Sequence, residues 1–470
     1  MPVDTKNKQY VDNQKIWKKC RDAVEGQEAI HKGSVEYLPK LSGQSTTEYV
    51  SYRDRALFYN ASQRTVDAMS GLLFRKSANV VIPTPLEPWL DNIDMQGNSL
   101  QTFTENLADE VLVVGRVGVL VEHSVKTEDV RTIADAERNG LRPFLTSYRA
   151  EDIINWNQTT LNGVKVLNLV VLREYHSVQG EDEFTWQTVE KYRVLDLVEG
   201  VYRQRVFVKD RNANFTLESE IVPRVRGNAF NYIPFIIISG KDADFSVIKP
   251  PILDLVNVNL SHYKTMADLE HGAHFTGLPT PIITGHNLSD DETFSIGSTT
   301  AWVLPNEETD VKYLEFTGQG LGALESRLVS KERQMATLGA RLLVEEKAAV
   351  EAAETHNIKR QGENSALSSV AESISSGMTD ALSILVEWSG VSSNDVEYSI
   401  NKDFVPGTMD ASTMVALLQI WQSGGMSFAE FIRNLQQGEI VNAEKSVEDI
   451  RQEIETDGPV GLAIGDIENE

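Results

Sequence analysis

The chain has 470 residues, 41% of them hydrophobic, and a formal net charge of −25 at pH 7. This length allows roughly two to four domains, whereas the acidic charge excludes a protein that grips DNA phosphates through an extended basic face. Cys20 is the single cysteine, which excludes an intrachain disulfide and a thiolate-rich zinc site. No apolar stretch approaches the roughly 20 residues of a membrane span, and the N-terminus lacks a signal-peptide core. We therefore expect neither membrane insertion nor export by that route.

The first quarter of the chain is predicted to hold helices separated by breaks. Residues 1–45 are mixed and polar, and we treat them as an N-terminal extension. Apolar residues recur at intervals of three and four over 46–75, which predicts a helix. Three prolines between 83 and 88 then break the chain. Asn98 or Ser99 can cap the next helix.

Strand-like sequence fills the stretch from Val117 to about Ser239. It is rich in β-branched and aromatic residues, and polar turns such as Asn162-Gly163 separate its runs. No helices are regularly interposed, so we expect a largely antiparallel or mixed sheet. A helix is expected over about 252–275, followed by more strand-and-turn sequence.

The remainder is predicted to be mainly helical. Leucine and methionine recur at heptad-like spacing in the helix that opens at Leu321. The segment 344–363 is polar and alanine-rich, and a further apolar repeat runs over 367–388 before a short strand around 396–400. Short helices and an acidic tail after Asp457 complete the chain. Two residue pairs have helix-start spacing: Ser427 with Glu430, and Ser446 with Asp449.

A glycine-rich turn, Gly318–Ala323, follows a strand and fits the dinucleotide-binding pattern G-x-G-x-x-A. That fold also needs a second parallel strand ending in an acidic residue about 20 residues further on. Here the helix is expected to continue past Gly339, and no strand appears until about Val396. We interpret the turn as a flexible hinge, and a cytoplasmic nucleotide-binding enzyme built on it is kept as an alternative.

Other catalytic and metal-binding patterns are weak. Glu270, His271 and His274 contain H-x-x-H, but a zinc protease helix needs H-E-x-x-H, and no third ligand lies nearby in sequence. The sequence contains neither a P-loop nor a G-x-S-x-G elbow. We therefore expect no enzyme, no cofactor and no metal.

Charge is distributed unevenly near the long helices. An acidic group, in which Lys312 is the single base, crowds the excursion before Leu321. It is a solvated loop, a docking surface or a wall that repels phosphate. Its members are Asp290, Asp291, Glu292, Glu307, Glu308, Asp310 and Glu315. By contrast, Lys347, Lys359 and Arg360 lie in the weakly patterned segment and would touch DNA weakly and transiently.

This order of parts resembles the portal (head-to-tail connector) family of tailed bacteriophages over roughly residues 45–455. Four stretches carry the resemblance, the first of them to a portal branch often labelled only as a phage domain of unknown function. They are YVSYRDRALFYNASQRTVDAMSGLLFRK, TGQGLGALESRLVSKERQMATLGARLL, ETHNIKRQGENSALSSVAESI and LLQIWQSGGMSFAEFIRNLQQGEIV. One departure is that no sharply basic tunnel loop is found.

The resemblance implies an α+β, portal-like fold: a wing domain with a mixed or antiparallel sheet, long stem helices, a small α/β clip and a C-terminal helical crown. The implied parts are the wing (46–250), first stem helix (251–278), clip (279–320), second stem helix (321–343), tunnel loop (344–365), a long helix and strand returning to the wing (366–404), the crown (405–456) and a disordered acidic tail (457–470).

It also implies a function. The expected protein forms a dodecameric ring at one capsid vertex of the virion, assembled in the host cytoplasm, and serves as the channel for packaging and ejection of double-stranded DNA. The implied partners are the terminase large subunit, the head-completion or tail adaptor, and the major capsid and scaffolding proteins. Another virion connector ring is an alternative, although 470 residues is long for a head-completion adaptor.

Overall fold

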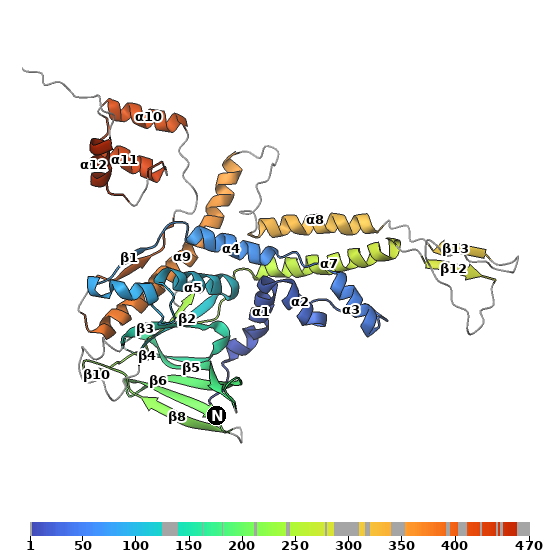
Figure 1. Cartoon of the computed structure of the whole chain (residues 1–470), viewed down its shortest axis with the longest axis horizontal. Coiled ribbons are helices and arrows are strands. Elements are labelled where there is room, and N and C mark those ends of the chain that lie inside the picture. Colours follow the sequence, from blue (N-terminus) through green and yellow to red (C-terminus); the bar gives the residue numbers. More distant parts are fainter. Residues whose placement is uncertain are drawn as a thin grey trace, which may run out of the picture. The chain divides into compact units, whose positions relative to one another are not determined.

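The computed structural model describes most of the chain (Figure 1). The described residues are 2–124, 140–161, 163–180, 182–210, 214–240, 245–277, 280–285, 310–314, 320–339, 353–391, 395–402, 411–423, 425–438, 440–441 and 445–457. The chain forms two compact units, Met1–Asn401 and Lys402–Glu470.

The N-terminal residues are folded into the first unit, which corrects their treatment as an extension. Helices α1 (Lys8–Glu25) and α2 (Gln27–Gly33) are followed by the short 3₁₀ helix η1 (Ser34–Glu36). Trp17 and Cys20 are fully buried on α1, which contacts α4, α5 and α7. A few large side chains on one face suffice to dock a helix whose overall composition is polar.

The helix predicted over 46–75 is two helices, because the chain breaks between residues 56 and 60. Helix α3 (Thr46–Arg55) begins with a capping box formed by Ser45 and Glu48. Helix α4 (Ala61–Leu73) begins at Asn60, whose side chain accepts a hydrogen bond from the Gln63 N–H. Each break therefore has its own capping residue, which the apolar periodicity alone does not register.

Helix α5 (Leu100–Val114) begins where predicted. Ser99 is its N-cap and accepts a hydrogen bond from the Thr102 N–H, and the helix ends at Gly115 with a φ of 86°. Before it lie β1 (Asn79–Val81) and the 3₁₀ helix η2 (Thr84–Asn92), in which Leu86 is buried.

The predicted antiparallel β-structure is confirmed: the paired strands of the described residues are antiparallel. Of the two larger sheets, one has the strand order β11-β2-β3 and the other has the order β4-β5-β6-β7-β8. The strands are β2 (Arg116–His123), β3 (Pro143–Arg149), β4 (Ile153–Leu161), β5 (Val164–Gln179), β6 (Trp186–Val198), β7 (Val201–Lys209), β8 (Phe215–Ile221) and β11 (Phe235–Ser239). The 3₁₀ helix η3 (Ala150–Asp152) links the sheets, and β9 (Arg224–Val225) pairs with β10 (Asn228–Ala229).

Helix α9 (Ala353–Ser389) packs on the three-stranded sheet. The predicted apolar repeat is buried along it: Leu367, Val370, Ile374, Met378, Ala381 and Leu385. Gly377 permits the close approach, because a Cβ there would lie 2.5 Å from Ile238 Cγ1. The strand after α9, β14 (Glu397–Ser399), pairs with β1.

The start of α9 corrects the predicted loop over 344–365. Residues 353–365 are helical, and 344–352 lie outside the described residues. The helical part contains glutamate, lysine, arginine and glutamine, which favour helix without any apolar face. A helix already nucleated on the sheet can extend through such a sequence, because propagation costs little compared with nucleation.

Helix α7 (Leu253–Gly277) is the helix predicted over about 252–275, and α8 (Leu321–Thr337) lies alongside it (Figure 1). Between them, β12 (Thr280–Thr284) and β13 (Asp310–Leu314) form an antiparallel pair. The expectation that the helix opening at Leu321, which is α8, continues past Gly339 is wrong. The Leu338 N–H bonds back to the carbonyls of Gln334 and Met335, and Gly339 has a φ of 141°, which helix excludes.

The second unit contains α10 (Ala411–Gln422), α11 (Phe428–Gln437) and α12 (Val447–Asp457). Both predicted helix starts are confirmed: Ser427 caps α11 with Glu430, and the Asp449 N–H donates to Ser446 Oγ at 3.1 Å. Phe431, Ile432 and Ile450 form its buried core. Among the described residues of both units, no helix is long and apolar enough to cross a bilayer.

A buried amide on α7 fixes the position of α4. Asn259 is fully buried; its Nδ2 donates to the Tyr59 carbonyl at 3.0 Å, and its Oδ1 accepts from the Ala61 N–H at 3.2 Å. Helix α7 also accepts a 2.6 Å hydrogen bond at Asp268 from the Tyr52 hydroxyl of α3. Helices α3 and α4 are thereby held on α7 by specific polar contacts as well as by apolar packing.

We predict that Asn259→Ala lowers the free energy of unfolding of the first unit. The variant loses two hydrogen bonds from a fully buried amide, each worth about 0.5–1.5 kcal/mol, and the Ala61 N–H and the Tyr59 carbonyl keep only their mutual bond of 2.8 Å. Urea titration followed by circular dichroism measures the loss. Asn257→Ala, at an exposed position of the same helix, is the matched control, with an expected change within about 0.5 kcal/mol. Equal losses in both variants would contradict the assigned role.

Candidate functional site

The two long helices that flank the β12–β13 pair are joined by buried polar contacts. His262 on α7 has a side chain only 1% exposed, and its Nε2 lies 3.4 Å from Glu332 Oε1 on α8. Beside it, Lys331 Nζ donates to the Ser261 carbonyl at 2.8 Å and to Thr265 Oγ1 at 2.5 Å. These contacts fix both the rotation and the height of α8 on α7.

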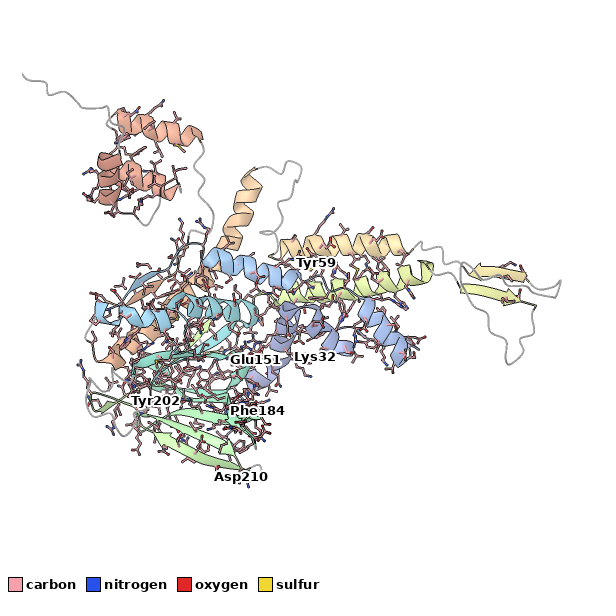
Figure 2. All side chains as sticks on the ribbon, in the orientation of Figure 1. Lys32, Tyr59, Glu151, Phe184, Tyr202 and Asp210 are labelled. Carbon is pink, nitrogen blue, oxygen red and sulfur yellow. The ribbon has the colours of Figure 1, made fainter. Side chains whose placement is uncertain are left out.

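Burial sets the ionisation of this contact. It lowers the pKa of His262, and the nearby Glu332 carboxylate opposes that shift. Burial also lowers the pKa of Lys331, and the Arg327 charge adds to the effect. The ring of Tyr59 (labelled in Figure 2) lies 5.8 Å from that of His262, so α7, α8 and the chain that leads into α4 all contact the histidine.

An apolar cluster completes this junction. Met335 of α8, Leu255 of α7 and Ala61 of α4 are buried together, with Val258 packed against them. The cluster lies one helical turn from Asn259, since residues three or four apart share a helix face. Three helices thus meet at one point, where they are joined by both polar and apolar contacts.

The predicted docking residues lie mostly beyond the described part of the chain. Asp290, Asp291, Glu292, Glu307 and Glu308 are outside the described residues.

Asp310 is described: it opens β13, is exposed, and lies 2.5 Å from Lys312 Nζ. The hydrogen bond to Asp310 raises the pKa of Lys312. In the described hairpin, therefore, the single base predicted among the acidic residues is paired with one of them.

The glycine-rich turn does not sit in a dinucleotide-binding unit. Strand β13, which precedes it, pairs antiparallel with β12, whereas the dinucleotide fold needs parallel strands joined by the helix. Gly320 has a helical φ of −74° and begins α8 without a side-chain cap, and Gly318 lies outside the described residues. The described geometry gives the alternative of a nucleotide-binding enzyme no support.

The predicted DNA-contacting residues are partly located. Lys347 lies outside the described residues, whereas Lys359 and Arg360 belong to the helical backbone of α9.

The histidines singled out in the sequence lie near the end of α7. His271 packs edge-on against Tyr52 at a ring distance of 5.2 Å. In the part of the chain that the structure describes, no three histidine, cysteine or acidic side chains are grouped to hold a metal ion.

Partly buried ion pairs of the first unit were missed by sequence reasoning. Arg21 of α1 bonds Glu110 of α5 at 2.6 Å and Glu151 of η3 at 2.5 Å (Glu151 is labelled in Figure 2). Arg193 similarly joins Glu122 and Glu174 across the two sheets. The partners of Arg21 are 89 and 130 residues away, so no local pattern signals them.

Residues 251–389 match the family model described as "Domain of unknown function (DUF4055)". The matched region is less than a third of the chain. It runs from α7 through the β12–β13 pair and α8 to the end of α9. The match supports the predicted resemblance to a branch labelled as a domain of unknown function, although the stretch that suggested this label, YVSYRDRALFYNASQRTVDAMSGLLFRK, lies outside the matched residues.

Solved structures also share similarity with the chain. A chain of the "Virion of native gene transfer agent (GTA) particle" has a TM-score of 0.40 and 15% identity, and the alignment covers 87% of this chain and 97% of that one. For the "Neck of empty GTA particle computed with C6 symmetry" the values are 0.39, 15%, 83% and 93%. For the "Neck of native GTA particle computed with C12 symmetry" they are 0.39, 13%, 86% and 98%. No curated protein matches the sequence.

We predict that the α7–α8 contact makes stability depend on pH. The pKa of His262 lies below its ordinary value of 6.5 in the folded chain. As pH falls through 6.5, the unfolded chain therefore gains a proton that the folded chain resists, and the free energy of unfolding drops by at most about 1.4 kcal/mol per pH unit. At higher pH the histidine is neutral in both states and the full stability is present.

Comparison of the wild type with His262→Gln isolates this contribution. Thermal unfolding between pH 7.5 and 5 should show a shallower acid loss in the variant, whereas Glu332→Gln should extend the loss to lower pH because the carboxylate favours the charged histidine. Identical slopes for the wild type and His262→Gln would contradict the prediction.

Proposed function

We propose that this protein is the portal of a tailed bacteriophage: a closed ring, dodecameric by the family resemblance, at one vertex of the capsid. The observation that carries the proposal is the architecture of residues 251–389, in which two packed helices flank a strand pair and a third long helix returns to a sheet. This is the stem, clip, stem and returning-helix order of the portal resemblance. In these terms α7 and α8 are the stem helices, and the β12–β13 pair belongs to the clip.

The physical properties of the chain support a channel. Helix α7 has 25 residues, and at 1.5 Å per residue it spans about 38 Å, enough to form part of a channel wall. A head-to-tail interface that closes on itself produces a ring. A subunit with a net charge of −25 suits a pore for DNA, because each phosphate contact would slow transit.

Native mass spectrometry of the purified chain tests this proposal. We expect a single species of about twelve 52.4 kDa subunits, as closed cyclic assembly requires, and electron micrographs should show a central channel wide enough for duplex DNA. A stable monomer at micromolar concentration would overturn the proposal. The alternative of a smaller connector ring would appear as a different subunit number without the capacity to nucleate packaging.

We also propose that the acidic clip binds the terminase large subunit during packaging and the head-completion or tail adaptor afterwards. Charged rims steer association more than they fix affinity, which suits partners that exchange. The capsid and scaffolding proteins would surround the ring at its vertex.

Combined neutralisation, Asp290→Asn with Asp291→Asn and Glu292→Gln, should weaken terminase capture in a pull-down and leave the ring intact. Neutralising three exposed acids of the first unit, Glu87, Asp91 and Glu183, is the control. Unchanged capture by the clip variant would exclude these three residues as the docking site.

For DNA, we propose weak phosphate contacts by Lys347, Lys359 and Arg360. Because α9 begins at Ala353, the last two residues would act from a helix and not from a loop. A few bases in an acidic pore give each subunit a screened contact that breaks and re-forms as DNA slides.

We expect Lys359→Ala with Arg360→Ala to preserve the ring while reducing packaged DNA, because each subunit loses two phosphate contacts. The DNA content of filled particles gives the measurement. Lys8→Ala with Lys15→Ala, on the exposed surface of α1, controls for loss of two positive charges. Full-length packaging by the α9 variant would count against these contacts.

A further inference from the structure

The two flanks of α8 carry opposite charges. Leu328 and Met335 mark the buried face of α8, and at about 100° per residue Glu325 and Arg327 lie on either side of it. They are about 200° apart around the helix axis but only about 3 Å apart along it. Neither charge is paired within the described residues. At this height one flank is therefore acidic and the other basic, whereas the exposed Arg333 lies about 12 Å further along the axis, between the acidic flank and the face opposite α7.

Each flank also exposes apolar surface. Val329 lies on the acidic flank and is 46% exposed, and Leu338 lies on the basic flank and is 44% exposed. Ala336 stands on the acidic flank about 3 Å below Leu338 along the axis. Both flanks of one helix therefore offer apolar surface beside a charge, and the packing on α7 covers neither.

We propose that the acidic flank of α8 (Glu325, Val329 and Ala336) packs against the basic flank (Arg327 and Leu338) of α8 in the next copy of this chain. The inference rests on the proposed ring and names its subunit contact. In a head-to-tail ring every copy shows different surfaces to its two neighbours, so a single helix must carry both halves of the contact. The flanks of α8 meet that requirement.

The register follows from helix geometry. Copies related by rotation about an axis parallel to α8 have equivalent residues at equal heights, so Glu325 faces Arg327 of the next copy with an offset of about 3 Å. Ala336 faces Leu338 with the same offset. The aliphatic part of Arg327 covers Val329, as long basic side chains commonly do.

Charge complementarity favours a second copy over other occupants. An acidic partner would be repelled by Glu325, and a basic partner would be repelled by Arg327, if it spanned both flanks. DNA phosphates would meet the acidic flank on one side. A copy of the same helix satisfies both flanks at once, and like charges brought face to face in any shifted register would disfavour that arrangement.

Charge reversal in the full-length chain tests this contact. Glu325→Arg places two arginines opposite each other at every interface, and Arg327→Glu does the same with two glutamates. In each single variant the fraction of subunits assembled in rings should fall about tenfold at a fixed protein concentration, because like charges facing each other at an interface oppose association. The double variant Glu325→Arg with Arg327→Glu restores opposite charges and should restore the ring. An equimolar mixture of the two single variants should form rings in which they alternate.

Ser330→Arg and Ser330→Glu, on the exposed face opposite α7, are the controls and should assemble like the wild type. Circular dichroism establishes that every variant is folded. This contact would be overturned if both single variants formed rings as well as the wild type, or if neither the double variant nor the mixture formed rings. Either result would leave the proposed ring itself intact. A monomeric wild type would instead overturn the proposed function.

Discussion

The first unit depends on the buried polar groups of α7. Apolar packing alone allows a helix to slide or rotate among neighbours, whereas a buried amide or imidazole must find its partners. Asn259 satisfies two backbone groups beside α4, and His262 lies against Glu332 of α8. These contacts give α7 one rotation and one height, and α3, α4 and α8 take their positions from it.

Partly buried ion pairs fix the relative positions of helices and strands in the sheet region in the same way. Arg193 holds Glu122 and Glu174 from different strands, and Arg21 ties α1 to Glu110 and Glu151. Arginine suits these sites because its planar guanidinium bonds two carboxylates at once. Removing either arginine would take this partner from two partly buried carboxylates, which costs more than the intact pairs contribute.

Arg116 shows a different solution to the same problem. Its guanidinium is buried without a hydrogen-bond partner among the described residues, and burial lowers its pKa to about 10. It lies 4.3 Å from the ring of Trp156, so the aromatic face partly compensates for lost water. The site is costly, and it joins the beginning of β2 to β4.

The sequence predicts those elements whose formation depends on local periodicity or capping. Helices α5 and α7, the apolar half of α9 and both helix starts of the second unit follow from side chains a few residues apart. The docking of α1 was missed because it depends on a few large residues, such as Trp17, in a polar sequence. The end of α8 was missed because the apolar pattern continues past it. The helix ends because Gly339 has a φ of 141°, which the sequence does not reveal.

The candidate site was predicted less well than the fold. The residues that join α7 to α8, His262 and Lys331 with Glu332, carry no motif, because their partners are about 70 residues away and meet only after the β12–β13 excursion folds back. The residues chosen from charge were mostly exposed or outside the described part. Charge along a sequence reports composition, whereas a site needs the positions that tertiary packing supplies.

Helix α8 illustrates how one short helix can serve several neighbours. The face with Leu328 and Met335 is closed by α7. The opposite face carries the small polar side chains Ser326, Ser330 and Thr337 together with the exposed Arg333. The two flanks remain, and in the proposed closed ring each subunit has two neighbours to meet them. The 17-residue helix α8 therefore has different side chains on each of its sides. Substitutions on the different sides of α8 should disturb different contacts.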